Sequence, residues 1–204
     1  MMPVEGAAVR PRNITPGTAW GDNRRRKAGH GYTARAEGGV AGRQIELKSG
    51  GRTVASGLEW GAPGSRRPAL LLVAGSHAPA EWTAFAERLA GLHRVIALAW
   101  RDTGNDLAGA CRSVAGGTVL IAHGGACKDA ARYAASGAAG LVALVLSDCP
   151  ADDVAGLRVA APVLILRGRQ SALMSHAEAV ALREAFPGSR LIEPEECGSW
   201  PFGS

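Results

Sequence analysis

The sequence has no hydrophobic run that is long enough to cross a membrane as a helix. A membrane-spanning helix needs about 18 consecutive apolar residues, whereas the most apolar segments here have the length of β-strands: 70–74, 95–100, 141–146 and 160–166. The first 40 residues also lack a central apolar stretch after their charges, which a secretory signal would have. We therefore expect neither a membrane span nor a secretory signal.

Cysteine is scarce, and the cysteines are not paired. The chain has four of them, widely spaced and without a CxxC motif, at Cys111, Cys127, Cys149 and Cys197. This spacing fits neither a zinc site nor a disulfide framework. We expect no metal, no other cofactor and a reducing, cytoplasmic location.

The basic and acidic residues are unevenly distributed along the 204 residues. Residues 1–40 hold seven Lys and Arg against three Asp and Glu, so the rest of the chain is nearly neutral. This first segment has no repeating apolar face with which to offset the entropy of ordering. The sequence predicts a flexible basic arm over 1–40 and one compact domain over 41–204. The basic run at 24–27 has no interleaved aromatic residues, so a nucleic-acid partner is not expected.

The pattern of the domain changes from a hairpin to alternating strands and helices. Strand-like segments at 44–47 and 53–60 flank Ser49-Gly50-Gly51, whose glycines allow the positive φ of a tight turn. Continuous apolar runs, typical of parallel strands that are covered on both faces, then alternate with helical periodicity. We expect further strands at 69–74, 94–99, 118–122, 141–147, 163–166 and 190–193, and helices at 80–90, 106–113, 126–136 and 175–186. This order predicts an α/β fold, a mostly parallel mixed sheet that starts with a β-hairpin and has helices on both faces.

The turn AHGGA at 122–126 lies between an expected strand and an expected helix. In a G-x-S-x-G elbow, a serine occupies such a sharp strand-to-helix turn, and small residues flank it. The segment TVLIAHGGACKDAARYAASGAAGLVALVLSDCP at 118–150 resembles the elbow region of the α/β-hydrolase superfamily, and the resemblance extends over about 45–202. The two neighbours of the serine position match, but Gly124 occupies the position itself.

A second segment, 68–104, looks like the third strand, oxyanion loop, first helix and fourth strand of the same family. The resemblance implies two backbone N–H donors for an oxyanion hole. One would come from Ser76, and the other from Gly125, the residue after the serine position. Such donors stabilise a developing negative charge, but they do not by themselves form an acyl-enzyme.

The resemblance also implies where the acid and the base would stand. Segment 161–193 is similar to the family's seventh strand, acid loop, helix and eighth strand, with Ala172 at the aspartate position. In the closing loop, Ser199 stands at the histidine position. Gly124, Ala172 and Ser199 are all non-catalytic types for these roles, and loss of the nucleophile or the base alone lowers turnover by about a millionfold in a working triad.

The remaining candidates for the pocket lining are Ser76, His77, His123, Gly125 and Asp148. Asp148 ends a strand at which some members of the family carry an alternative acid. Cys127 opens the helix after the turn, where the helix dipole can lower the pKa of a thiol, so these two residues form the best hypothesis for a rescued activity. A packed thiol is the plainer interpretation of Cys127, and a structural role beside the turn is the plainer one of His123.

Two parts of the family's fold are short or missing in this sequence. Fourteen residues separate Asp148 from Val163, where many relatives insert a helical lid, and the chain ends at Ser204, where the family usually continues into a closing helix. The resemblance therefore implies an apolar sheet face without its usual cover, and such faces commonly mark interaction sites. A homodimer, a partner protein or the arm would supply the cover.

These residues favour an α/β-hydrolase-like protein that lacks the hydrolytic triad, a pseudoenzyme that binds a small-molecule ligand or a protein partner. One alternative is an enzyme that uses the same pocket without a covalent step, such as a cyclase, lyase or isomerase. Another is a residual esterase-type hydrolase. A third possibility is a decayed or truncated paralogue without a selected activity.

Overall fold

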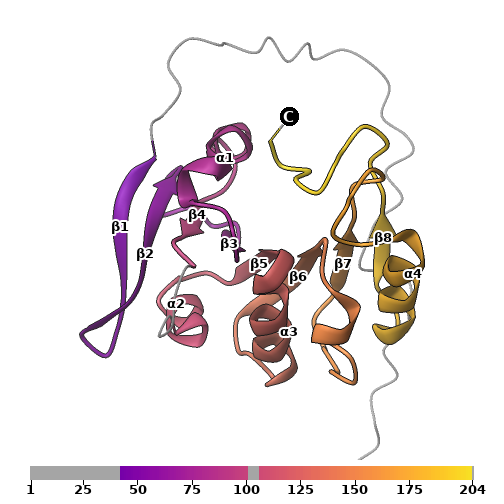
Figure 1. Cartoon of the computed structure of the whole chain (residues 1–204). Helices are drawn as coiled ribbons and strands as arrows, with labels where there is room; N and C mark the ends of the chain where they lie inside the picture. The colour runs from indigo at the N-terminus through magenta and orange to yellow at the C-terminus, as the bar shows by residue number, and fades with distance from the viewer. Residues whose placement is uncertain (1–41, 101–105, 204) are drawn as a thin grey trace, which may run out of the picture. The chain divides into compact units, whose positions relative to one another are not determined.

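The computed structural model describes residues 42–100 and 106–203, so the predicted basic arm lies outside the described residues. Within them, eight strands form one sheet, in the order β1-β2-β4-β3-β5-β6-β7-β8 (Figure 1). The strands are β1 (Arg43–Ser49), β2 (Arg52–Trp60), β3 (Ala69–Ala74), β4 (Val95–Leu98), β5 (Thr118–His123), β6 (Leu141–Ser147), β7 (Val163–Leu166) and β8 (Arg190–Ile192). The helices are α1 (Thr83–Ala90), α2 (Leu107–Arg112), α3 (Cys127–Ala135) and α4 (His176–Ala185), with 3₁₀ turns η1 (Pro79–Trp82), η2 (Gly124–Ala126) and η3 (Ala151–Asp153).

The predicted hairpin at the start of the domain is confirmed. β1 and β2 pair antiparallel, and the turn between them contains Gly50 and Gly51, whose φ angles of 58° and 79° suit glycine. β2 also pairs antiparallel with β4, while every pair of neighbours from β4 to β8 is parallel. The prediction of a mostly parallel mixed sheet is therefore confirmed.

The expected helix over 80–90 differs from the observed element in its first turn. The chain forms the tighter turn η1 before α1 begins. The Glu81 carboxylate accepts a hydrogen bond from the Ala78 N–H at 2.7 Å, and the Thr83 hydroxyl donates to the Ala80 carbonyl at 2.7 Å. These local bonds satisfy backbone groups that the first turn of an α-helix leaves without partners.

The two faces of the sheet bury separate apolar clusters, as the predicted helices on both faces require. Side chains of α2, α3 and α4 pack with Leu71 and Val73 on one face, whereas α1 lies on the other face with Leu70 and Leu72. The segment after β8 runs back toward α1 (Figure 1) and adds Phe202, which is 4% exposed, to the second cluster. The chain itself thus covers part of the face that the resemblance implied to be open. No helix among residues 42–100 and 106–203 is long and apolar enough to cross a membrane.

One acid is buried in the sheet close to its hairpin edge. Glu59 in β2 is 3% exposed and accepts hydrogen bonds from Arg43 and from Arg94, whose Nε lies 2.6 Å from Glu59 Oε1. Burial raises the pKa of Glu59, but the two guanidinium groups outweigh burial and keep this pKa below its ordinary value. The three side chains link β1, β2 and the start of β4.

Candidate functional site

Gly124 has the backbone conformation of an elbow residue. It directly follows β5, begins η2 and has φ of 56°, in the left-handed region that favours glycine. A Cβ atom built on Gly124 would have no heavy atom within 4 Å, apart from its chain neighbours. The turn is therefore sharp, and it leaves room for a side chain that this chain does not have.

The loop after β3 lies against this turn. A Cβ atom built on Gly75 would be 3.4 Å from the Ala126 nitrogen and 3.5 Å from Gly125 Cα. The Gly75 N–H also points to the His123 carbonyl, at 3.5 Å. The structure thus brings Ser76, the next residue of the loop, and Gly125 to the same end of the sheet, beside Gly124.

Ala172 and Ser199 lie together, although they are 27 positions apart in the sequence. The Ala172 N–H donates to Ser199 Oγ at 2.9 Å, and Ser199 Oγ is 3.2 Å from Ser171 Oγ. The Ser199 carbonyl lies 2.5 Å from His123 Nε2. These contacts join the loop after β7, the segment after β8 and the turn after β5, but positions 124, 172 and 199 supply no carboxylate and no imidazole.

A buried histidine and a buried aspartate lie next to this turn. His123 ends β5 and Asp148 follows β6; they are 1% and 0% exposed, and His123 Nε2 is 3.9 Å from Asp148 Oδ2. Nε2 must carry a proton, because a carbonyl such as that of Ser199 can only accept. Within the described part of the chain, His123 Nδ1, Ser147 Oγ and both carboxylate oxygens of Asp148 have no hydrogen-bond partner. Buried polar atoms of this kind are rare in native structures, and each calls for a physical explanation.

The surroundings favour the neutral form of both groups. Burial lowers the pKa of His123, the contact with Ser199 opposes this, and the nearby His77 lowers the pKa further. Burial raises the pKa of Asp148; Ser171 lies near enough to oppose this shift, although no hydrogen bond of normal geometry forms. Asp148 also has φ of 46°, which is strained for a residue with a side chain. The fold therefore holds an acid in a costly position, as functional sites often do.

We expect Asp148→Asn to be more stable than the wild type at neutral pH. Because the pKa of Asp148 is raised in the folded state, its contribution to stability is present below its ordinary pKa of 3.8 and is lost as the pH rises through the folded pKa. An amide avoids the buried charge, and asparagine tolerates positive φ. The gain is on the order of 1 kcal/mol at neutral pH and vanishes near pH 3. Urea unfolding at both pH values measures it, and a less stable variant at neutral pH would contradict this account.

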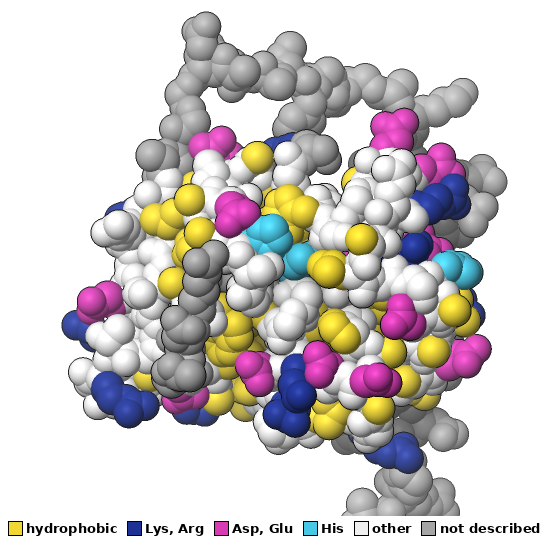
Figure 2. Space-filling model, in the orientation of Figure 1, with side chains coloured by type: hydrophobic (Ala, Val, Ile, Leu, Met, Phe, Trp, Pro, Cys, Tyr) yellow, Lys and Arg dark blue, Asp and Glu magenta, His cyan; other side chains and the backbone are white. Residues whose placement is uncertain are grey.

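An aromatic cluster covers the histidines. The Trp200 indole stacks on the His77 ring, with centroids 3.8 Å apart and planes at 25°, and lies edge-on to His123 at 4.9 Å and to Trp82 at 4.7 Å. His77 Nδ1 lies 2.5 Å from a carboxylate oxygen of Glu81. In Figure 2, histidine reaches the surface in the middle of the face shown, among hydrophobic side chains. Sequence reasoning placed His77 here but missed Trp200, because no local pattern marks that residue.

The environment of Cys127 does not support a replacement nucleophile. Its thiol is buried and contacts the carbonyls of Ala122 and Ser147 at 3.4 and 3.5 Å. Burial, and then the thiol of Cys149, raise the pKa of Cys127 well above its ordinary value. A protonated and inaccessible thiol packs as a small apolar side chain.

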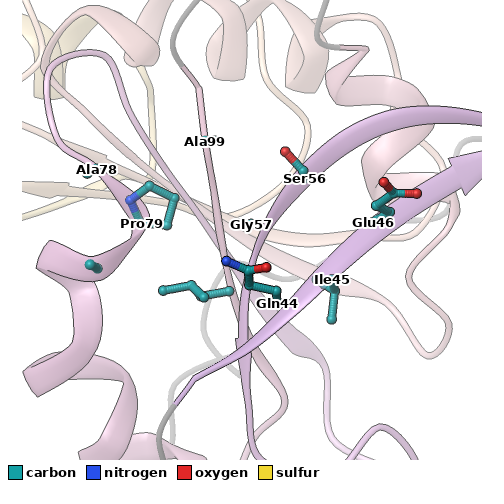
Figure 3. A pocket seen from close by; sticks show the side chains of 10 residues that line it. Gln44, Ile45, Glu46, Ser56, Gly57, Ala78, Pro79 and Ala99 are labelled. Atoms are coloured by element: carbon teal, nitrogen blue, oxygen red, sulfur yellow. The ribbon is translucent and has the colours of Figure 1, made fainter.

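A separate cavity of about 510 Å³ lies between the hairpin and η1 (Figure 3). Its polar lining comes from Gln44, Glu46 and Ser56, and its apolar lining includes Leu58 and Pro79. No residue that the sequence predicted for the pocket lines this cavity. Among residues 42–100 and 106–203, no three His, Cys, Asp or Glu side chains come together as metal ligands.

Comparisons with known proteins agree on the fold. No protein-family model and no curated protein sequence matches the chain. It is similar to the structure of an N-formylmaleamic acid deformylase from Pseudomonas putida, with a TM-score of 0.61 and 13% identity over 77% of this chain and 94% of that one. It is also similar to an esterase domain from a Rhodothermus marinus protein (TM-score 0.60, 14% identity, 78% and 89%) and to the thioesterase domain of the curacin biosynthetic pathway (0.59, 11%, 78% and 94%). At these identities the likeness shows the fold alone: the described part of the chain has the α/β-hydrolase fold.

Proposed function

We propose that this protein does not hydrolyse esters through an acyl-enzyme and instead binds a ligand at the end of the sheet where an α/β-hydrolase carries its triad. One observation carries the proposal: Gly124 has the conformation of a nucleophile elbow but no side chain that could attack. Ala172 and Ser199 meet next to it without an acid or a base between them. Related folds host unrelated functions, so the hydrolase activity of similar structures does not transfer with the fold. The ligand is a small molecule or a protein, a second copy of this chain included.

The purified full-length chain tests this proposal with a fluorophosphonate probe and an activated ester. We expect no stoichiometric label and no ester turnover above that of the buffer. The positive control is the triple variant Gly124→Ser, Ala172→Asp, Ser199→His, because position 124 has room for a side chain and Ser199 Oγ is 2.9 Å from the Ala172 nitrogen. We expect this variant to take a label at position 124. Stoichiometric labelling of the wild type would contradict the proposal.

The buried pair of His123 and Asp148 favours a second function, acid–base chemistry without a covalent step, as in a cyclase, lyase or isomerase. A neutral imidazole can accept a proton, and a carboxyl group whose pKa burial raises holds its proton to a higher pH than an ordinary one and can then donate it. The Asp148→Asn variant separates the two functions. A binding protein keeps its ligand in this variant, because the side chain of asparagine still has a carbonyl oxygen that accepts a hydrogen bond, whereas an acid–base enzyme loses about a hundredfold or more of its turnover.

A further inference from the structure

Trp200 occupies a slot whose walls come from two parts of the chain that are remote from it in sequence, the connection after β3 and the end of β5. His77 follows β3, Trp82 belongs to η1 and His123 ends β5, and the rings of all three contact the indole. Phe202 adds a further ring, 5.3 Å from Trp200. Trp200 itself is only partly buried, so the slot opens to the surface. Stacked and edge-on arrangements of this kind favour a planar aromatic occupant.

The chain fills this slot with a hydrogen-bond acceptor as well as a ring. The acceptor is the Ser199 carbonyl, which takes the hydrogen bond from His123 Nε2, and the ring is the indole of the next residue. A carbonyl followed by a planar ring is the pattern that an N-acyl aromatic amide, or a similar aromatic carbonyl compound, would present.

The slot also has polar groups that the segment after β8 does not use. His123 Nδ1 and both carboxylate oxygens of Asp148 are buried without a partner among the described residues, and Asp148 Oδ2 lies 3.9 Å from the nitrogen that bonds Ser199. Buried groups without hydrogen bonds lose free energy that a polar ligand can restore. The site can therefore bind a ligand that makes more polar contacts than Ser199 and Trp200 do.

We propose that this slot binds an aromatic carbonyl compound, with a planar ring of about the size of indole and an amide, ester or acid carbonyl, and that Ser199 and Trp200 occupy the slot as an internal competitor. This inference rests on the proposed function, in which the site binds and does not hydrolyse. The ring of the ligand takes the place of the indole on His77, and its carbonyl accepts the hydrogen bond from His123. Asp148 offers an acceptor to a donor group of the ligand.

N-acetyltryptophanamide is the probe that reproduces this pattern, because its acetyl carbonyl corresponds to Ser199 and its indole to Trp200. In calorimetric titrations of the full chain, we expect Trp200→Ala to bind the probe about tenfold more tightly than the wild type. In the wild type only the molecules whose slot is open can bind, so the internal competitor lowers the apparent affinity in proportion to that fraction. Trp100→Ala is the matched control. Trp100 is a partly buried indole that packs in the other apolar cluster, so its loss leaves the affinity unchanged.

A cavity left by a missing indole would bind any indole, so a second ligand is needed to test the role of the carbonyl. We expect 3-methylindole, which has the ring without a carbonyl, to bind Trp200→Ala about tenfold more weakly than the probe does. Equal affinities for the two ligands would overturn the proposal, as would equal affinities of Trp200→Ala and Trp100→Ala for the probe. Trp200→Leu, which keeps an apolar side chain, replaces the alanine variant if that variant unfolds.

The wild type gives an independent measurement. Saturation with N-acetyltryptophanamide is expected to increase amide hydrogen exchange over residues 196–202, because the ligand displaces this segment. Unchanged exchange at saturation would overturn the proposed competition. Failure of the proposed function looks different: fluorophosphonate labelling or ester turnover by the wild type would contradict it, whereas the affinities above address the slot alone.

Discussion

Gly168→Ala is expected to destabilise the protein by about 3 kcal/mol and to release the segment after β8. A Cβ atom on Gly168 would lie 1.9 Å from the Gly198 carbonyl oxygen and 2.6 Å from the Cys197 carbonyl oxygen. Both are backbone atoms, so no side-chain rotation relieves the clash, and the whole segment has to move. Urea unfolding measures the loss of stability, and hydrogen exchange over 196–202 measures the release.

Gly198→Ala is the matched control, because it adds the same methyl group on the other side of the same contact. A Cβ atom there would have no heavy atom within 4 Å apart from its chain neighbours, so we expect a change in stability within about 0.5 kcal/mol. Gly168→Ala should also bind N-acetyltryptophanamide more tightly than the wild type does, since it weakens the internal competitor without altering the slot. If the rate of hydrogen exchange over 196–202 in Gly168→Ala equals that of the wild type, the position of the segment does not depend on this contact.

The strands and the hairpin could be predicted from the sequence because their signals are local. The apolar run at 69–74 becomes β3, whose residues are all buried, and Gly50 and Gly51 take the positive φ that their turn requires. Position 124 could be located for the same reason, because a small-residue turn between a strand and a helix is a short pattern. The register of β5 on β6, which pairs His123 with Ser147, then brings His123 and Asp148 together.

The slot around Trp200 could not be predicted because the residues that form its walls are remote from Trp200 in sequence. His77, Trp82 and His123 precede Trp200 by 77 residues or more, and their rings meet only after the sheet has assembled. The close approach of Gly168 to Gly198 has no local signal either, since glycine is compatible with many backbone conformations. The cavity beside the hairpin likewise depends on how η1 packs against β1 and β2. Sequence patterns identified the residue types at the site but not the segment that covers it.

Arg94→Met is expected to destabilise the protein by about 3 kcal/mol at neutral pH. Arg94 is one of two partners of Glu59, which is 3% exposed, and without it the buried carboxylate keeps only Arg43, whose side chain is 67% exposed. Methionine replaces the apolar stem of the arginine and removes the charge, so the loss reports mainly on the ion pair. Arg43→Met is the matched control, and we expect it to cost less than Arg94→Met because the Arg43 side chain is 67% exposed and solvent screens its charge. Urea unfolding of both variants measures the difference.

The pH dependence of this stability loss separates the contribution of the buried charge from that of side-chain packing. In the wild type the pKa of Glu59 lies below its ordinary value of 4.5, so the stabilisation is present above that value and is lost as the pH falls through the folded pKa. In Arg94→Met only one guanidinium remains to lower the pKa against burial, so the carboxyl group takes up a proton at a higher pH than in the wild type and the penalty of its charge fades in acid. The stability gap between wild type and variant is therefore widest at neutral pH and narrows below about pH 4. If the difference in stability between wild type and variant stays constant down to pH 3, the loss of stability comes from packing of the arginine stem against the sheet and not from the buried charge.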